Sequence, residues 1–291
     1  MRALCIGECM VELSDAGEGL LRQRFAGDTF NTAWYLKRQR PGWAVDYLSA
    51  VGTDAISDAM LAFMDQSGIG TGHVARRADR TVGLYLIRLE DGERSFSYWR
   101  GQSAARTLAD DPGALAEGLA GAGLAVFSGI TLAILPPEGR AKLLAALRGF
   151  GGVVAFDPNM RARLWPSQAE MLAAVAEAVG VSDVVLPSFD EEAEMRGDAS
   201  PEVTLARYRA LGAGTVVVKN GGGRIVACDR AEGALWHDPA AVTPVDTTAA
   251  GDSFNAGFLA ARLDGADMAT SLAAGAALAA HVIGGIGALV P

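Results

Sequence analysis

DTTAAGDSFNAGFLA, residues 246–260 of the 291-residue chain, is the stretch that says most about the fold. Its small residues Thr247 to Gly251 predict a tight turn, and Ser253 to Arg262 predict a helix, with Asp252 in the first turn. Unpaired N–H groups and the helix dipole make such a helix start an anion-binding site. A carboxylate beside it can take a proton from a hydroxyl that attacks a phosphoryl group. The stretch therefore indicates phosphoryl transfer with Asp252 as base; the alternative is a carboxylate that only caps the helix.

The composition indicates a globular protein with a large core. Hydrophobic residues make up 50% of the chain and charged residues 20%, which is atypical of disorder. The 25 basic and 34 acidic residues give a net charge of −9, and this balance argues against a nucleic-acid-binding surface. An anionic ligand must therefore be held by a few local cations or backbone N–H groups.

The sequence gives no sign of export or of a membrane span. Its three cysteines lack metal-ligand spacing and their odd number argues against a disulfide framework, so we expect a reducing, cytoplasmic setting. Glu8 and Glu12 interrupt any signal-peptide core at the N-terminus. The stretch from Met268 to Pro291 has no Asp, Glu, Lys or Arg, but its alanines and glycines favour a close-packed helix followed by a loop. We expect no membrane partner.

The second half of the chain alternates short apolar runs with helical stretches, a pattern typical of a parallel sheet with crossover helices. Polar residues follow the runs, and ligands of open α/β sheets bind beyond the carboxyl ends of the strands. We therefore expect Gly129, Asp157, Ser188 and Lys219 to converge on one site. The expected strands are 124–129, 152–158, 183–187 and 215–219, and the expected helices lie near 138–148, 167–179, 190–196 and 201–211.

The first half contains a segment whose pattern predicts a lid. Residues 80–100 form two strand-like runs joined by the turn sequence EDGE, which predicts a hairpin. Strand alternation puts Phe96 and Tyr98 on the face opposite Ser97 and Trp99. A β-lid inserted into the α/β body explains this hairpin, and a purely structural edge hairpin is the alternative.

Three further motifs supply candidate binding groups. In AGDTFNTA (26–33), Gly27 could permit close approach of a substrate and Asn31 could bind hydroxyls; alternatively, Asp28 or Thr29 caps a helix over 29–38. In FDPNMRARLW (156–165), polar side chains follow a strand. In KNGGGR (219–224), the glycines could lie against phosphates or a ribose, or could form a hairpin turn.

Several chemistries are disfavoured by motifs that the sequence lacks. It has no G-x-x-x-x-G-K-[ST], no complete G-x-G-x-x-G and no H-R-D or D-F-G set. Its three histidines occur in no H-E-x-x-H motif, and G-x-S-x-G is absent. The sequence therefore disfavours zinc hydrolysis, serine hydrolysis and dinucleotide oxidoreduction.

Taken together, the motifs resemble those of the ribokinase-like (PfkB) carbohydrate kinases. AGDTFNTA and DTTAAGDSFNAGFL match two family signatures in the right order and about 220 residues apart. The resemblance implies an α/β fold: a three-layer αβα sandwich with a mostly parallel sheet and a small β-sheet lid. It further implies one kinase domain over 1–291, with the lid formed by strands inserted at roughly 8–26 and 82–101.

Within the family, the sequence is most similar to the branch that acts on 2-keto-3-deoxygluconate. The phrases IGECMVELS, GERSFSYWR, SGITLAIL and FDPNMRARLW carry this closer match. It implies ATP-dependent phosphorylation of the 6-hydroxyl of 2-dehydro-3-deoxy-D-gluconate, giving 2-dehydro-3-deoxy-6-phospho-D-gluconate. A fructokinase or other neutral-sugar kinase is the alternative within the enzyme class, and a non-catalytic ribokinase-like sugar sensor is the alternative outside it. Retention of Asp252 argues against the sensor, because binding alone needs no base.

The resemblance also implies the role of each site residue. The catalytic group would be the base Asp252 with an anion hole of N–H groups from Ala249, Ala250, Gly251 and Asp252 itself. The sugar acid would contact Gly27, Asp28, Asn31, Tyr85, Tyr98, Arg100, Ile130, Arg161 and Asp252. The nucleotide would be held by Asn159, Ser188, Lys219, Gly221, Gly222, Gly223 and Arg224, together with Ala249, Ala250 and Gly251.

The implied cofactors are ATP and Mg²⁺, with Glu191 acting on the metal indirectly through water. The family also admits K⁺ near Asp246 and the loop 282–288, and self-association through the lid into a homo-oligomer. The chain departs from the family pattern at two places. Ala249 stands where most members have glycine, which the sugar-acid branch tolerates, and Ser188 stands where the N-x-x-E motif has asparagine.

The charge pattern independently favours an acidic sugar. Arg100 ends the aromatic second strand of the hairpin, and Arg161 lies in the polar loop after a strand. A planar guanidinium pairs bidentately with a carboxylate, so two arginines at a sugar site favour an acid over a neutral hexose. The alternative is that either arginine binds phosphate or lies on the surface.

Overall fold

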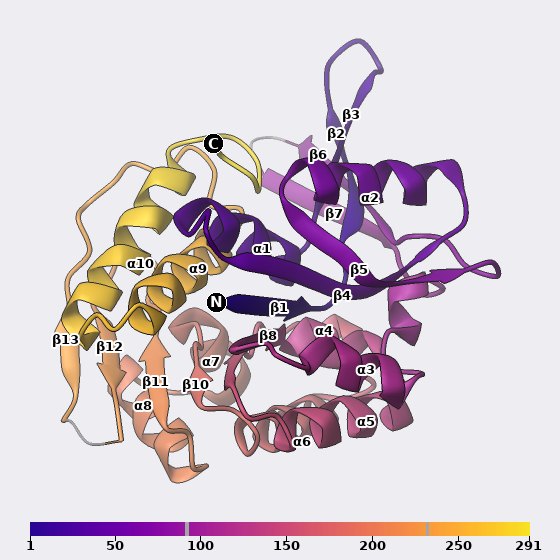
Figure 1. The fold of residues 1–291 in the computed structure, drawn as a ribbon. Helices are drawn as coiled ribbons and strands as arrows, with labels where there is room; N and C mark the ends of the chain where they lie inside the picture. The colour runs from indigo at the N-terminus through magenta and orange to yellow at the C-terminus, as the bar shows by residue number, and fades with distance from the viewer. Residues whose placement is uncertain (91–92, 231–232) are drawn as a thin grey trace.

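A nine-stranded sheet forms the centre of the molecule, with helices on both faces, and a separate four-stranded sheet stands beside it (Figure 1). The structure is a computed structural model that describes residues 1–90, 93–230 and 233–291. Within these residues the large sheet is parallel from β5 to β11 and antiparallel from β11 to β13. The predicted α/β class with a mostly parallel sheet is confirmed. In spatial order the strands are β13 (Leu235–His237), β12 (Ile225–Cys228), β11 (Thr215–Val218), β10 (Val184–Val185), β9 (Val153–Asp157), β8 (Leu124–Ser128), β1 (Arg2–Ile6), β4 (Ala44–Gly52) and β5 (Ile69–Arg77).

The two faces of the large sheet bury two separate hydrophobic cores. Successive side chains of β1 alternate between them: Ala3 and Cys5 belong to one core, and Leu4 and Ile6 to the other. Apolar runs are therefore needed in the central strands, because both faces are covered. The first core lies under α1 (Asp28–Gln39), α2 (Ala55–Gln66), α9 (Ala250–Leu263) and α10 (Met268–Ile283). The second lies under α3 (Pro112–Leu119), α4 (Gly129–Ile134), α5 (Pro137–Arg148), α6 (Gln168–Val179), α7 (Phe189–Arg196) and α8 (Pro201–Ala210).

The small sheet, here called the lid, has the strand order β3-β2-β6-β7. Its strands are β2 (Met10–Asp15), β3 (Leu21–Ala26), β6 (Leu84–Glu90) and β7 (Glu93–Trp99). Tyr98 stacks with both Tyr85 and Phe96 on one face, whereas Trp99 is 59% exposed, so the predicted alternation along β7 is confirmed. Asp91 and Gly92, the centre of the predicted EDGE turn, lie outside the described residues.

Glu8 holds together the four places where the chain passes between the large sheet and the lid, which we call the neck. Glu8 itself lies between β1 and β2, and its carboxylate pairs with Arg100, which follows β7. Gly27, after β3, lies so close that a Cβ there would collide with the carbonyl oxygen of Glu8. A Cβ at Gly83, before β6, would lie 2.6 Å from Oε1 of Glu8. The neck therefore has no room for larger side chains.

Some element boundaries differ from those expected. Helix α9 begins at Ala250 rather than Ser253, because the small residues of the turn already adopt helical geometry. Helix α1 begins at Asp28, and its N-cap is Gly27 with no side-chain cap, so capping by Asp28 or Thr29 was a wrong interpretation. The expected helix and loop after Met268 are present as α10 and the turn that follows it. Among the described residues, no helix is both long and apolar enough to cross a membrane.

The neck gives a test of the packing. Gly27→Ala forces a methyl group against the backbone of Glu8, which cannot move without shifting β1 or β2, so we expect a loss of about 1–3 kcal/mol in unfolding free energy. Gly42→Ala is the matched control, because a Cβ at Gly42 meets nothing within 4 Å. Urea unfolding of both variants measures the difference. Equal stability of the two variants would contradict the described neck.

Candidate active site

A cavity of about 800 Å³ lies between the lid and the carboxyl ends of β9, β10 and β11. Asp157 ends β9, and Ser188 and Lys219 follow β10 and β11, so three of the four expected strand-end residues line it. The fourth, Gly129, does not, although its neighbour Ile130 does. The sequence-predicted site residues that the cavity brings together are Gly27, Asp28, Asn31, Tyr85, Tyr98, Arg100, Ile130, Asn159, Arg161, Ser188, Glu191, Lys219, Ala249, Ala250, Gly251 and Asp252.

The glycine-rich segment after β11 does not line this cavity. Residues 220–223 form the turn of the β11–β12 hairpin, where the N–H of Gly223 donates to the carbonyl of Asn220 at 2.7 Å. Arg224 is exposed and pairs with Asp238 at 2.8 Å. The hairpin-turn interpretation is therefore right. The nucleotide contacts predicted for Gly221, Gly222, Gly223 and Arg224 stay a prediction for the open surface beside the cavity.

The turn before α9 presents backbone to the cavity. Thr247 to Gly251 line it with small side chains, and Asp252 lies in the first turn of α9, as predicted. Ala249 is the N-cap and has φ 62°, a left-handed conformation that costs a residue with a Cβ about 1–2 kcal/mol. Most residues avoid this region, so the strain shows that the surrounding structure imposes the turn.

Three aspartates crowd the floor of the cavity, and each accepts a hydrogen bond from an asparagine. Asn159 donates to Asp28 at 2.8 Å, and Asn31 donates to Asp252 at 2.8 Å. The third pair joins Asn255 to Asp157 at 2.6 Å. Amide donors stabilise carboxylates without adding charge, so the asparagines themselves leave the negative charge of this floor uncompensated.

Lys219 supplies the compensating charge at one side of the floor. Its ammonium group donates to Asp157 at 2.7 Å and to the side-chain oxygen of Asn255 at 3.2 Å. The side chain is only 8% exposed. A Cβ added to Gly251 would lie 3.3 Å from Nζ, so the cation is also beside the start of α9.

The environment of Asp252 favours its protonated form. Burial is the largest cause, the charge of Asp28 is the next, and together they raise the pKa of Asp252 to about 8. The hydrogen bond from Asn31 and the charge of Lys219 oppose the shift. A carboxyl group whose pKa lies near neutral pH is suited to general base catalysis, because it can accept and release a proton at working pH.

Both arginines expected to bind a carboxylate already pair with glutamates. Arg100 pairs with Glu8 at the neck, where neither side chain is more than 8% exposed. Arg161 pairs with Glu191, whose other oxygen accepts the N–H of Met160 at 2.9 Å. Gly27 also differs in part from its predicted role: its missing Cβ makes room for Glu8, in addition to lining the cavity.

The lid closes the cavity with aromatic rings. The Tyr85 and Tyr98 rings stack with centroids 5.8 Å apart, and Phe96 stacks on Tyr98 at 6.2 Å. The hydroxyl of Tyr85 donates to the buried carboxylate of Glu12 at 2.5 Å, which fixes the ring. The rings thus form an ordered apolar wall over a polar floor.

Sequence reasoning missed Asn255, Arg163 and Glu8 as site residues. A signal for Asn255 is present, because GDTFN (27–31) and GDSFN (251–255) share one pattern and both begin helices. Asn31 and Asn255 hold the same place in that pattern, and both donate to an aspartate of the floor. Glu8 and Arg163 give no such signal, since their partners are distant in sequence.

Comparison with known proteins identifies the family. The model of the pfkB family carbohydrate kinases matches residues 2–291. The chain belongs to this family. A 2-dehydro-3-deoxygluconokinase of Dickeya dadantii is 40% identical over 98% of this chain and 96% of its own length. The Escherichia coli K12 enzyme of the same name is 39% identical over the same shares, and a fructokinase of Vibrio alginolyticus is 29% identical over 87% of this chain and 81% of its own.

Solved structures share the fold of this carbohydrate kinase. A PfkB protein from Polaromonas sp. JS666 superposes with a TM-score of 0.86 at 29% identity, covering 98% of this chain and 96% of the other. A putative ribokinase II from Escherichia coli in complex with ATP and Mg²⁺ has a TM-score of 0.83 at 22% identity, with 99% and 94% covered. The ribokinase-like expectation is confirmed. As a family member, the chain is a phosphotransferase that acts on an alcohol group.

The strained turn gives the first test of the site. Ala249→Gly removes the clash between Cβ and a left-handed backbone, so we expect it to stabilise the protein by about 1 kcal/mol. Ala250→Gly is the control, because Ala250 is helical and glycine there should destabilise by a similar amount. Thermal unfolding of the two variants measures both effects. A loss of stability in Ala249→Gly would mean that the turn is not left-handed.

The raised pKa of Asp252 predicts a pH-dependent stability. An aspartate with a folded pKa of about 8 and an ordinary value of 3.8 binds its proton more tightly when folded, so its contribution to stability falls as pH rises between these values. Asp252→Asn cannot ionise. Its stability relative to the parent protein should therefore grow from about pH 4 to about pH 8, by at most about 1.4 kcal/mol per pH unit, and then stay constant. Urea unfolding at several pH values measures this, and a difference independent of pH would refute the shift.

Proposed function

We propose that the protein is a sugar-acid kinase that transfers the γ-phosphoryl group of ATP to the 6-hydroxyl of 2-dehydro-3-deoxy-D-gluconate. The observation that carries the substrate is the 40% identity, over 98% of the chain, to a 2-dehydro-3-deoxygluconokinase. The geometry that supports the chemistry is a carboxyl group of raised pKa in the first turn of a helix whose N-terminus faces the same cavity. The product is 2-dehydro-3-deoxy-6-phospho-D-gluconate.

In the proposed reaction, the carboxylate of Asp252 accepts the proton of the 6-hydroxyl as its oxygen attacks the γ-phosphorus. The bond between that phosphorus and the bridging oxygen of ADP breaks, and ADP leaves with the bonding electrons. N–H groups of Ala249 to Asp252 form the anion hole, where charge on the transferred group increases. Asn31 orients the base through its hydrogen bond at 2.8 Å. Lys219 adds positive charge beside this loop.

Mg²⁺ enters this scheme with ATP, as part of the substrate. Among the described residues, no group of three or more His, Cys, Asp or Glu side chains could hold a metal ion, which fits a cation bound mainly by phosphates and water. Both oxygens of Glu191 already accept hydrogen bonds, so Glu191 would reach Mg²⁺ only through water. Asn159 and Ser188 are proposed nucleotide contacts.

Three further expectations stay predictions. A K⁺ ion would have to share Asp246, whose carboxylate oxygens accept the N–H groups of Thr248 and Gly287 at 2.9 and 2.8 Å. Self-association through the lid would cover the edge strands β3 and β7 of the small sheet. A cytoplasmic location accords with three buried free thiols.

The sugar acid is proposed to lie under the lid, with Tyr85, Tyr98 and Ile130 against its carbon chain. Asp28 and Asn31 are its proposed hydroxyl partners. Arg100 and Arg161 remain proposed contacts of the acid, although each also pairs with a glutamate. Closing the aromatic lid would exclude water and limit hydrolysis of ATP. The fructokinase alternative has weaker support, because the Vibrio alginolyticus fructokinase is 29% identical.

A coupled ADP-release assay tests the function. We expect kcat/KM for 2-dehydro-3-deoxy-D-gluconate to exceed that for fructose, and Asp252→Asn to lower kcat by about 10²–10⁴-fold because the general base is lost. Calorimetry of Asp252→Asn should still detect binding of the acid and of ATP. Preference for fructose would favour the neutral-sugar alternative, binding without turnover would favour the sensor, and a near-normal kcat in the variant would mean that another group is the base.

A further inference from the structure

Four cationic side chains line the cavity, and three of them are paired with carboxylates. Arg100 pairs with Glu8, Arg161 with Glu191, and Lys219 with Asp157. The fourth is Arg163, which is exposed and makes no ion pair with any side chain that the structure describes, in residues 1–88, 95–230 and 233–291. Among the described cations that line the cavity, Arg163 is thus the one whose charge is not offset by an ion pair with a carboxylate.

Arg163 is held in place by an aromatic ring of the lid. Its guanidinium carbon lies 4.0 Å from the centroid of the Tyr98 ring, a cation–π contact. Tyr98 is itself fixed between Tyr85 and Phe96 in the aromatic stack. Because a guanidinium that lies over a ring keeps its N–H groups in its own plane, those donors stay available to a planar acceptor such as a carboxylate.

Arg163 also connects the two parts of the molecule that enclose the cavity. It lies in the short 3₁₀ helix η2 (Ala162–Leu164), which follows β9 of the large sheet, whereas Tyr98 belongs to β7 of the lid. A ligand group bound by Arg163 would therefore sit where the lid meets the body. The proposed sugar contacts Tyr85, Tyr98 and Arg161 line the same cavity, and Tyr98 contacts Arg163 directly.

The charge balance of the cavity makes an unpaired cation necessary for an anionic substrate. A carboxylate that approaches Arg100 or Arg161 also meets the charge of Glu8 or Glu191, so each pair attracts it weakly. On the floor, Asp28 makes no ion pair with a described side chain, so its charge repels the carboxylate. The protein as a whole has a net charge of −9, so attraction at long range does not help.

We propose that Arg163 is a specificity-determining residue that binds the carboxylate of the sugar acid, with Tyr98 as the residue that positions its guanidinium. This proposal rests on the proposed function and deepens it. A neutral sugar offers no carboxylate to Arg163, so it gains nothing from this side chain. Arg163 thereby separates acid from neutral substrates, while Asp252 acts on both alike.

The test compares two sugars that differ only at the first carbon. 2-Dehydro-3-deoxy-D-gluconate carries a carboxylate there, and 3-deoxy-D-fructose carries CH₂OH. Hydrogen bonds to charged groups contribute about 1.5–3 kcal/mol, so Arg163→Gln should raise KM for the acid by about 10- to 150-fold. KM for ATP, kcat for the acid and kcat/KM for 3-deoxy-D-fructose should each change less than about threefold. Arg163→Lys should recover part of the acid preference.

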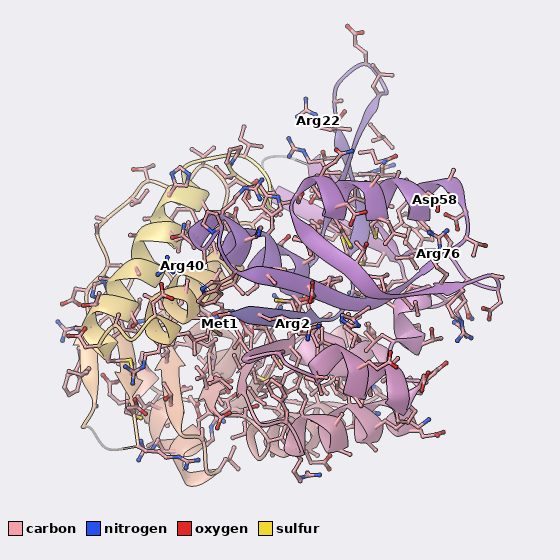
Figure 2. The ribbon with its side chains drawn as sticks, viewed as in Figure 1. Met1, Arg2, Arg22, Arg40, Asp58 and Arg76 are labelled. Carbon is pink, nitrogen blue, oxygen red and sulfur yellow. The ribbon has the colours of Figure 1, made fainter. Side chains whose placement is uncertain are left out.

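Arg76→Gln is the matched control, because it removes the same charge from a surface site. Arg76 pairs with Asp58 of α2 at 2.6 Å (Figure 2), and neither residue lines the cavity. We expect Arg76→Gln to leave kcat/KM for both sugars unchanged. A general electrostatic effect would instead lower kcat/KM for the acid by the same factor in Arg76→Gln and in Arg163→Gln. That outcome would overturn the proposal.

A double-mutant cycle tests the role of Tyr98. Tyr98→Leu should raise KM for the acid in the parent protein. The same substitution should raise this KM by a smaller factor when Arg163→Gln is already present. Tyr98→Phe, which keeps a ring, should raise KM for the acid less than Tyr98→Leu does. Fully additive effects would overturn the positioning role.

If the parent protein prefers the acid and Arg163→Gln keeps that preference, or raises KM for ATP instead, the role of Arg163 is wrong and the proposed function stands. If the parent protein prefers the neutral sugar, the proposed function itself fails.

Discussion

Crowding of Asp28, Asp157 and Asp252 on one cavity floor is the electrostatic constraint on which the rest of the site depends. Like charges at close range and low exposure favour protonation of at least one member. Three asparagines and Lys219 limit the cost, and they come from four separate segments of the chain. The large sheet places the ends of β9 and β11 beside the starts of α1 and α9, and so brings these side chains together.

The same constraint shapes the lid. The unpaired charge of Asp28 on this floor repels an anionic substrate, so the attraction must come from the arginines that line the same cavity beside the aromatic rings of the lid. Two of those arginines are neutralised by Glu8 and Glu191. Such pairs contribute order more than attraction, because each fixes a loop at the rim of the cavity. Positioning and selection are thus divided between different side chains.

Much of the fold and part of the site could be predicted from the sequence, because they depend on patterns among residues that are close together in the chain. The alternating apolar runs and the DTTAAGDSFN turn depend on short-range patterns, and the structure has the corresponding strands and a helix, α9, with Asp252 in its first turn. The pairs Arg100–Glu8 and Arg163–Tyr98 could not be foreseen, because they join residues that tertiary packing alone brings together. KNGGGR was ambiguous for a related reason: a glycine-rich segment after a strand serves equally as a turn or as a phosphate loop.

The neck at Glu8 has a consequence for how substrate preference can change among related enzymes. The lid is built from two chain segments that leave and re-enter the body at four points, and Glu8 touches the other three. If recombination replaced only one of these segments with that of a related enzyme, buried Glu8 would face residues that differ from those it contacts now. Lids of different specificity are therefore exchangeable as a matched pair of segments, whereas the tip of the β2–β3 hairpin, at residues 16–20, is free to vary in length.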